Sequence, residues 1–460
     1  MRYISTRGGI APLRFKDAVM MGLADDGGLL LPESIPTFSP EQLESWRGCS
    51  YQELAFTIIS RFVDDIPAAD LRELINRSYA TFSHPDVTPV VRHDGVHILE
   101  LFHGVTLAFK DVALQFLGNL FEYILKERNE TMTILGATSG DTGSAAIHGV
   151  RGKDGITIFI LHPHGKTSPV QALQMTSVLD ANVHNIAMDG TFDDCQDMVK
   201  ALMGDLEFKQ KYSLGAVNSI NWARVLAQVV YYIYAWLKVA KTGQKVIFSV
   251  PTGNFGDIFA GYVATRMGLP VEKLLLATNE NNILTRCITS GDYSVGSVVQ
   301  TLSPSMDIQV ASNFERYLFY LFNQDSTRVQ AAFSQLKAEG RISFSDREIA
   351  QLQKDFCSAS VNRAQTLETI GAFKRDTGYL LDPHTAVGVR AAQGLSAGDT
   401  PLICLATAHP AKFDEAVVAA TGAPVPMPES IAQLHGLSTR CDRLPADLTA
   451  LREYIVRTMA

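Results

Sequence analysis

Short apolar runs alternate with helix-like segments along most of this 460-residue chain. The runs are rich in Val, Ile and Leu and end near Gly, Ser, Thr or Asn; they occupy residues 96–101, 131–137, 156–161, 183–188, 245–250, 273–278 and 400–407. Runs of this kind are typical of strands that are buried on both faces of a parallel sheet. Because helical patterns separate them, the sequence predicts an α/β fold with mostly parallel sheets flanked by helices.

The first 95 residues have a different pattern. Short helical stretches at 40–46, 51–62 and 69–80 are joined by loops, which predicts a helix-rich N-terminal domain over residues 1–95. We expect a large domain formed by residues 96–125 and 245–460 and a small domain formed by residues 126–244. A final amphipathic pattern at 446–459 predicts a terminal helix.

Composition narrows the class of protein. A hydrophobic share of 46% is enough for a large core, and a formal charge of −8 argues against a nucleic-acid partner. Six scattered cysteines without a CxxC motif indicate a reducing, cytoplasmic environment. The histidines are not paired at the spacing of metal ligands, so the sequence predicts no metal site. The N-terminus lacks the apolar core of a signal peptide, and the apolar stretch 225–240 is short enough to be a core helix.

A glycine-rich turn, PTGNFGD, follows the strand predicted at 245–250. Its glycines permit a tight curl with inward N–H groups, and the next helix adds the positive end of its dipole. Such turns bind phosphate, so the candidates are Gly253, Asn254, Phe255, Gly256 and Asp257. The alternative is an ordinary glycine-rich turn, because the sequence contains neither a P-loop nor GxGxxG at this place.

Two further turns carry polar residues at the ends of predicted strands. The turn after 131–137 contains Thr138, Ser139, Asp141 and Thr142, whose hydroxyl and N–H groups suit a carboxylate. Helix capping is the alternative, although one or two such residues are enough for a cap. Thr407 ends the strand at 400–407 and is of interest only beside the other turns.

Lys110 lies in an apolar stretch, just ahead of a helical pattern that Asp111 is expected to cap. A cation at a helix N-terminus is unfavourable, and the preceding residues 107–109 are expected to desolvate the amine. Both effects lower the pKa of a lysine and favour a neutral nucleophile, although a surface lysine with an apolar stem is the alternative. A nucleophilic amine, a phosphate-binding turn and a carboxylate-binding turn together indicate pyridoxal 5′-phosphate.

Four segments, HGVTLAFKD, ATSGDTG, PTGNFGD and TAHPAKF, resemble in kind and order the motifs of the threonine synthase family, in its shorter microbial and fungal subfamily. The likeness begins at YISTRGG and DGGLLLPE and continues into the last hundred residues, so it covers nearly the whole chain. That family has the fold type II architecture of pyridoxal-phosphate enzymes, which implies two open, mostly parallel sheets. It also implies a lyase that forms L-threonine and phosphate from O-phospho-L-homoserine and water, the last step of threonine biosynthesis.

The resemblance implies a role for each candidate. Lys110 forms the Schiff base with the cofactor and transfers protons, and Thr407 faces the pyridine nitrogen. Residues 253–256 enclose the cofactor phosphate and Asp257 closes that loop. The substrate α-carboxylate is received by Thr138, Ser139 and Thr142. Asp141 stands where other fold type II enzymes have an Asn near the 3′-oxygen of the cofactor, so it either shares a proton there or turns away to cap its helix.

The substrate carries a second phosphate, which requires a cationic partner. Arg224 and Lys166 are the candidates, and a surface ion pair is the alternative for each. Two other functions stay open: a fold type II Ser/Thr dehydratase, whose motifs usually differ from HGVTLAFKD and PTGNFGD, and a catalytically silent cofactor-binding paralogue. We expect small-molecule partners, no nucleic acid or membrane partner, and a monomer or homodimer in the cytoplasm.

Overall fold

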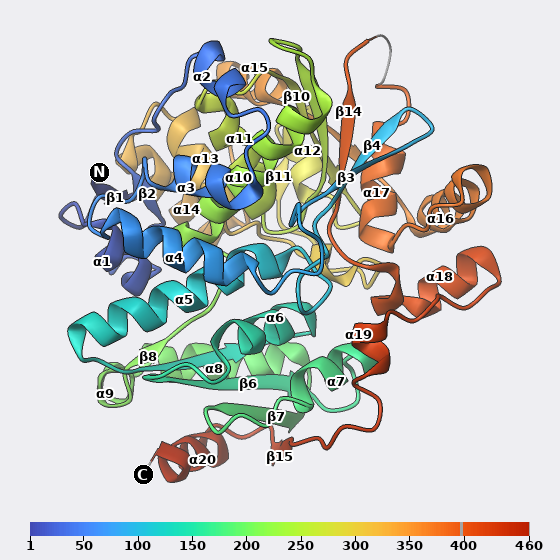
Figure 1. Cartoon of the computed structure of the whole chain (residues 1–460). Helices are drawn as coiled ribbons and strands as arrows, with labels where there is room; N and C mark the ends of the chain where they lie inside the picture. Colours follow the sequence, from blue (N-terminus) through green and yellow to red (C-terminus); the bar gives the residue numbers. More distant parts are fainter. Residues whose placement is uncertain (396–398, 460) are drawn as a thin grey trace. The chain divides into compact units, whose positions relative to one another are not determined.

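The computed structural model describes residues 1–395 and 399–459 and is shown in Figure 1. The chain forms two compact units. Unit 1 comprises Met1–Asn76, Phe82–His103 and Ser219–Val425, and unit 2 comprises Arg77–Thr81, Gly104–Asn218 and Pro426–Ala460. Each unit contains its own mostly or wholly parallel sheet, as the apolar runs predict.

The sheet of unit 1 has six strands in the order β13-β10-β9-β14-β4-β3. In chain order these are β3 (Val90–His93), β4 (Val96–Glu100), β9 (Val246–Pro251), β10 (Val271–Thr278), β13 (Phe356–Ser360) and β14 (Leu402–Ala406). Neighbouring strands are parallel except β3, which pairs antiparallel with β4 at one edge. Parallel strands end at the same edge of a sheet, so the turns after β9 and β14 lie on the same side of this unit.

Helices cover the unit 1 sheet. Apolar residues of β4, β9, β10 and β14 pack with α16 (Arg363–Thr377) and α17 (Pro383–Ala392) in one core cluster. Helix α10 (Trp222–Val239) packs against α11 (Gly256–Arg266), and every residue of α10 from Trp222 to Leu237 is buried. Helix α10 therefore confirms the core helix predicted at 225–240. Within the described residues, no helix is both long and apolar enough to cross a bilayer.

Shorter elements complete unit 1. The N-terminal part contains β1 (Tyr3–Ser5), α1 (Phe15–Met21), β2 (Leu30–Pro32), α2 (Pro40–Ser45), α3 (Tyr51–Ile59) and α4 (Ala68–Tyr79), whose last residues belong to unit 2. The later part adds α12 (Ile283–Ser290), β11 (Tyr293–Ser294), η1 (Pro304–Met306), α13 (Phe314–Leu321), α14 (Ser326–Glu339), β12 (Arg341–Ile342), α15 (Asp346–Asp355), η2 (Pro410–Lys412) and α18 (Asp414–Thr421).

The sheet of unit 2 has five parallel strands in the order β15-β7-β6-β5-β8. They are β5 (Met132–Ala137), β6 (Ile156–Pro163), β7 (Val183–Asp189), β8 (Leu214–Gly215) and β15 (Asp442–Pro445). The helices of this unit are α5 (Lys110–Arg128), α6 (Asp141–Val150), α7 (Pro169–Thr176), α8 (Phe192–Gly204), α9 (Leu206–Lys211), α19 (Glu429–Ala432) and α20 (Leu448–Met459). Strand residues of β5, β6 and β7 share a core cluster with α8 and α20.

Two glycines bring α5 and α6 into direct backbone contact. A Cβ on Gly118 would lie 2.0 Å from the carbonyl oxygen of Gly149, and one on Gly149 would lie 2.7 Å from that of Leu114. Only glycine fits at such contacts. This packing fixes the start of α5, which carries Lys110, relative to the start of α6, which carries Asp141, and to the preceding loop, which carries Thr138.

The predicted strands and helices are confirmed within a few residues, and the fold is of the α/β class with two mostly parallel sheets. The sequence did not predict β3, β13 and β15, which are short edge strands with few buried side chains. The compact units divide the chain differently from the predicted domains. Residues 104–125 and 426–460 join unit 2, because α5 packs on α6 and α20 packs on α8, whereas residues 219–244 join unit 1 through the packing of α10 on α11.

Candidate active site

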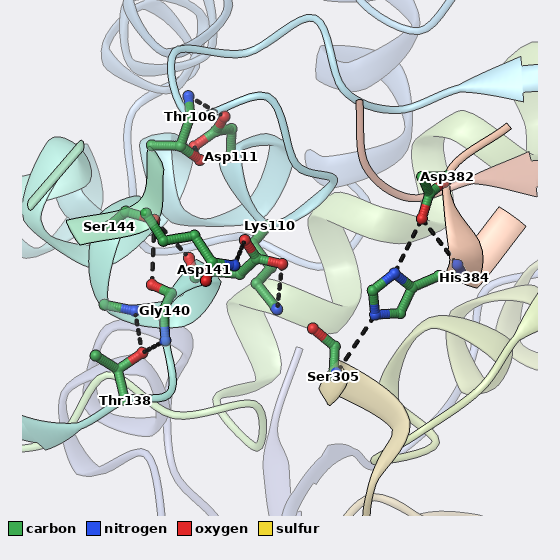
Figure 2. Close-up of polar contacts among 12 residues, drawn as sticks. Thr106, Lys110, Asp111, Thr138, Gly140, Asp141, Ser144, Ser305, Asp382 and His384 are labelled. Atoms are coloured by element: carbon green, nitrogen blue, oxygen red, sulfur yellow. Dashed lines mark hydrogen bonds and ion pairs between the residues drawn. The ribbon is translucent and has the colours of Figure 1, made fainter. Parts of the chain in front are cut away.

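Lys110 is the first residue of α5 and is only 8% exposed. Its Nζ lies 3.7 Å from Oδ2 of Asp141, which is the first residue of α6 and is also buried (Figure 2). The amine therefore occupies the place that the sequence predicts, a helix N-terminus in apolar surroundings. A carboxylate accompanies it there and favours the charged form of the amine.

Asp111 does not cap α5 as the sequence predicts. The N-cap residue is Phe109, and it makes no side-chain capping bond. Asp111 lies one residue inside the helix, where Oδ2 accepts from the N–H of Thr106 (2.7 Å) and Oδ1 accepts from its hydroxyl (2.8 Å). The carboxylate of Asp111 thus fixes the loop that leads into Lys110 (Figure 2).

The loop between β5 and α6 is ordered by Thr138. Its Oγ1 accepts hydrogen bonds from the N–H groups of Gly140 (3.0 Å) and Gly143 (2.8 Å), and Thr138 is buried (Figure 2). Ser139 is exposed and Thr142 is half-buried. Thr138 thus shapes the turn, while the side chains of Ser139 and Thr142 are available at its surface.

Oδ2 of Asp141 points toward Nζ of Lys110. Gly140 is the N-cap residue of α6 and has no side-chain capping bond. Oδ1 of Asp141 accepts from Nε2 of Gln171 in α7 at 2.8 Å. The two carboxylate oxygens of Asp141 thus have different neighbours, and no local pattern predicted the contact with Gln171.

The glycine-rich turn after β9 has the features of an anion-binding loop. Phe255 adopts a left-handed conformation (φ 63°), and α11 begins at Gly256 without a side-chain cap. The first N–H groups of this helix therefore have no capping side chain, as at helix N-termini that bind phosphate. Gly253 allows a close approach, since a Cβ there would lie 2.6 Å from the carbonyl oxygen of Ser305.

Asn313, which was not among the residues selected from the sequence, supports this turn. Its backbone N–H and its Nδ2 both donate to the carbonyl oxygen of Asn254, at 3.0 and 3.1 Å. Asn313 is fully buried. The contact spans 59 residues of sequence, so no local pattern could reveal it.

The side chain of Asp257 turns into the core of unit 1. Its Oδ1 accepts from the hydroxyls of Tyr231 (2.5 Å) and Tyr232 (2.8 Å) in α10, whereas Oδ2 is buried without a hydrogen-bond partner. Burial raises the pKa of this carboxyl to about 6, against the opposing effect of the two hydroxyls. Asp257 therefore anchors the turn through its side chain, and only its backbone is suited to an anion.

Thr407 follows β14 and is 6% exposed, with no hydrogen bond to its hydroxyl among the described residues. His384 lies at the start of α17. Its Nδ1 lies 2.9 Å from Oδ1 of Asp382, and its Nε2 accepts from the N–H of Ser305 at 3.3 Å (Figure 2). His384 thus holds the backbone turn against which Gly253 packs.

The two cationic candidates differ in their surroundings. Arg224 is the third residue of α10, is 6% exposed, and has no hydrogen-bond partner at Nη1. Burial lowers the pKa of its guanidinium to about 10. Lys166 is exposed and its Nζ donates to the carbonyl oxygen of Gly190 at 3.4 Å. A buried, incompletely paired guanidinium is the arrangement that an anionic ligand would stabilise.

Each unit by itself contains a feature that suits pyridoxal 5′-phosphate. In unit 2, a nearly buried primary amine suits the aldehyde. In unit 1, a helix N-terminus reached through glycines suits the phosphate. The chain also matches the family model described as "Pyridoxal-phosphate dependent enzyme" over residues 83–407. The fold and these residues define the class: a pyridoxal-phosphate-dependent enzyme of fold type II, which uses pyridoxal 5′-phosphate as its cofactor.

Two more family models match the ends of the chain: "Threonine synthase N terminus" over residues 2–79 and "Threonine synthase, C-terminal" over residues 385–455. The chain is 49% identical to the threonine synthase of Pseudomonas aeruginosa, over 99% of this chain and 98% of that protein. It is also 49% identical to the Saccharomyces cerevisiae threonine synthase, over 88% of this chain and 86% of that protein. The chain therefore belongs to the threonine synthase family.

Solved structures agree. A pyridoxal-phosphate-bound threonine synthase from Brucella melitensis superposes with a TM-score of 0.97 at 47% identity, covering 100% of this chain and 99% of that chain. The yeast threonine synthase gives 0.95 at 45% identity, covering 100% and 98%. A maize serine racemase, with a TM-score of 0.52 at 12% identity over 74% and 92%, shares the fold alone. The activity is that of a threonine synthase, a pyridoxal-phosphate-dependent lyase.

Proposed function

We propose that this chain converts O-phospho-L-homoserine and water into L-threonine and phosphate, with Lys110 as the amine that binds the cofactor and transfers protons. The observation that carries this assignment is the environment of Lys110: a nearly buried amine at a helix start, 3.7 Å from a buried carboxylate. Such placement restricts the amine to a small set of partners and suits a reactive group.

The cofactor, when bound, supplies an electron sink that makes the protons on Cα and Cβ of the substrate acidic. Nζ of Lys110 removes the Cα proton and delivers protons at the later positions, as a general base and then a general acid. Phosphate leaves from Cγ and water adds at Cβ, so the overall equation balances. Asp141 Oδ2 stabilises the ammonium form that Lys110 takes whenever it holds a proton.

The other candidates bind and orient. Gly253, Asn254, Phe255 and Gly256 offer backbone N–H groups to the cofactor phosphate, and Asp257 anchors that turn through the tyrosine hydroxyls. Thr407 offers a neutral hydroxyl to the pyridine nitrogen. Thr138, Ser139 and Thr142 receive the α-carboxylate of the substrate.

Arg224 is assigned to the substrate phosphate in preference to Lys166. Its guanidinium is buried and lacks a partner at Nη1, whereas Lys166 is exposed and its contact is a carbonyl oxygen. An ion pair with phosphate is stronger in the less hydrated site. Lys166 remains the comparison residue for this assignment.

The test is release of phosphate and formation of L-threonine by the purified, cofactor-loaded chain supplied with O-phospho-L-homoserine. We expect both products in equal amounts, and a Lys110→Ala variant to lose at least about 100-fold in rate, the scale of general acid–base catalysis. Phosphate release no faster than in buffer contradicts the assignment. Conversion of L-threonine into 2-oxobutyrate at a comparable rate favours the dehydratase alternative instead.

Labelling by the cofactor distinguishes an active enzyme from a catalytically silent paralogue. Borohydride reduction followed by peptide mapping should label Lys110, and labelling without turnover would indicate a binding protein that has lost catalysis. The matched control is Lys166→Ala, which should keep the label on Lys110. A label on any other lysine removes the assigned role of Lys110.

The acidic charge and the absence of a basic stripe in the sequence support small-molecule partners and no nucleic acid. We place the protein in the cytoplasm, as a monomer or homodimer. Light scattering coupled to size-exclusion chromatography measures the assembly, and a trimer or larger oligomer contradicts that part of the proposal.

A further inference from the structure

Gln171 of unit 2 binds the carboxylate of Asp141, which in turn lies beside Lys110. It lies in α7, 30 residues after Asp141, and is 6% exposed. Its Nε2 donates to Oδ1 of Asp141 at 2.8 Å, while Oδ2 of the same carboxylate lies 3.7 Å from Nζ of Lys110. Three buried side chains thus form a line from α7 through α6 to α5.

The orientation of the Gln171 amide is fixed from its other side. The hydroxyl of Ser168 donates to Oε1 of Gln171 (3.0 Å), and the Ser168 oxygen accepts from the N–H of Gln171 (3.3 Å) as the N-cap of α7. A carboxylate can only accept hydrogen bonds, so the amide must present its N–H to Asp141. Both ends of the amide therefore favour the same orientation.

The turn ahead of α6 leaves space for this amide. A Cβ on Gly140 would lie 2.2 Å from Oε1 of Gln171, and Gly140 has a backbone φ of 150°. Both the close approach and the left-handed conformation require glycine. The glycine between Ser139 and Asp141 thus permits Gln171 to reach the carboxylate.

We propose that Gln171 is a positioning residue that holds the carboxylate of Asp141 against Nζ of Lys110 and thereby sets the proton affinity of that amine. The inference rests on the proposed function only in taking Lys110 as the reactive amine. Hydrogen bonding from Gln171 stabilises the ionised form of Asp141, and an ionised Asp141 stabilises the ammonium form of Lys110. Loss of Gln171 weakens both effects in the same direction.

Other titratable groups on the helices packed around this line have separate partners. Asp111 of α5 accepts from Thr106, and Nε2 of His148 in α6 donates to the carbonyl oxygen of Gln174 at 3.0 Å. Helix α7 contains no Asp, Glu, His, Lys or Arg. Within unit 2, Asp141 is therefore the charged group that faces Lys110 from α6 and α7.

The test measures the reactivity of Lys110 in the full chain after removal of the cofactor. Acetylation by dilute acetic anhydride at pH 7, followed by peptide mass spectrometry, reports how much of each lysine is in the neutral, reactive form. Lys166, an exposed amine of the same unit, is the internal reference. We expect Asp141→Asn to raise the relative rate of acetylation at Lys110 about tenfold, because an adjacent carboxylate raises the pKa of an amine by about 1 or more.

Gln171→Met should raise the rate in the same direction by a smaller factor, about threefold to tenfold. In an Asp141→Asn background it should add nothing, because Gln171 acts through Asp141. Gln174→Met is the matched control: Gln174 is a buried glutamine of the same helix whose Nε2 donates to the backbone of Thr106 at 3.0 Å. It should lower stability without accelerating acetylation at Lys110.

If Gln171→Met does not fold, Ser168→Ala replaces it. That change keeps the Gln171 side chain in the core but removes the hydrogen bond from the Ser168 hydroxyl that orients the amide. It should raise the rate modestly in the wild type and leave it unchanged beside Asp141→Asn. Independent, additive effects of residues 141 and 171, or an unchanged rate in Gln171→Met, overturn the proposal. Failure of borohydride to label Lys110 is a different result, which concerns the proposed function and leaves this coupling intact.

Discussion

Nε2 of His384 accepts a hydrogen bond from the backbone N–H of Ser305 at 3.3 Å (Figure 2). Because Nε2 is the acceptor, the ring proton sits on Nδ1 and is donated to Oδ1 of Asp382, 2.9 Å away. The carbonyl of Ser305 in turn occupies the space beside Gly253 where a Cβ would be. A neutral imidazole thus supports the turn that we assign to the cofactor phosphate.

His384→Leu removes this acceptor and should weaken cofactor binding about tenfold, the effect of one lost hydrogen bond of about 1.4 kcal/mol. Titration of the cofactor-free chain with pyridoxal 5′-phosphate, followed by absorbance, gives the affinity. His384→Gln should recover most of it, since Oε1 of glutamine can accept from Ser305. Equal affinities in the Leu and Gln variants would show that the hydrogen bond has no role here.

Gly253→Ala tests the close approach directly. The new methyl group would lie 2.6 Å from the carbonyl oxygen of Ser305, so one of the two segments must move. Strain of about 1–3 kcal/mol predicts that the cofactor binds roughly 5-fold to 100-fold more weakly. Gly204→Ala is the control, because a Cβ at that position meets nothing within 4 Å. The proposed phosphate loop fails this test if the Gly253 variant binds as tightly as the control.

Arg224→Met should separate binding from stability. Because burial lowers the pKa of the guanidinium to about 10, its charge destabilises the folded chain, and removal should raise the free energy of unfolding by on the order of 3 kcal/mol. The KM for O-phospho-L-homoserine should rise about 10-fold to 100-fold, through loss of a charged contact to phosphate. Urea unfolding and steady-state kinetics are the measurements. An unchanged KM moves the phosphate contact to another group, with Lys166→Met as the next variant.

Asp257 provides a prediction with a defined pH window. Its pKa is raised by burial from 3.8 to about 6, so the folded chain binds a proton more tightly than the unfolded chain. Between those values stability falls as pH rises, and above about pH 6 the full penalty, on the order of 3 kcal/mol, is present. Asp257→Asn should therefore stabilise the cofactor-free chain at pH 7.5, with a gain that shrinks toward pH 4.

Urea unfolding at several pH values measures this, with the exposed Asp197→Asn as the control. A gain for Asp257→Asn that is the same at pH 4.5 and pH 7.5 would mean that the carboxyl is already neutral or already well solvated. The control should show no gain at either pH, because Asp197 is largely hydrated in the folded chain.

Local patterns were sufficient for the buried central strands, the start of α5 and the glycine turns, because each depends on residues within a few positions of one another. They were also sufficient to select Lys110, whose apolar neighbours precede it directly in sequence. The cap predicted for Asp111 was wrong because α5 begins one residue earlier, at Lys110, and the Asp111 carboxylate accepts from the N–H and the hydroxyl of Thr106. A local sequence pattern identifies possible hydrogen-bond partners but does not show which of them a side chain binds in the fold.

The sequence by itself determined the α/β fold, the position of Lys110 at a helix start and the glycine-rich turn between β9 and α11. Tertiary structure alone decided that Asp141 faces Lys110, that Gln171 orients it, and that the carboxylate of Asp257 lies under two tyrosine hydroxyls. These contacts join residues from different helices, so they depend on how α5, α6 and α7, or α10 and α11, pack. The packing of these helices depends on all the side chains in the core of each unit, so it cannot be predicted from any single segment of the chain.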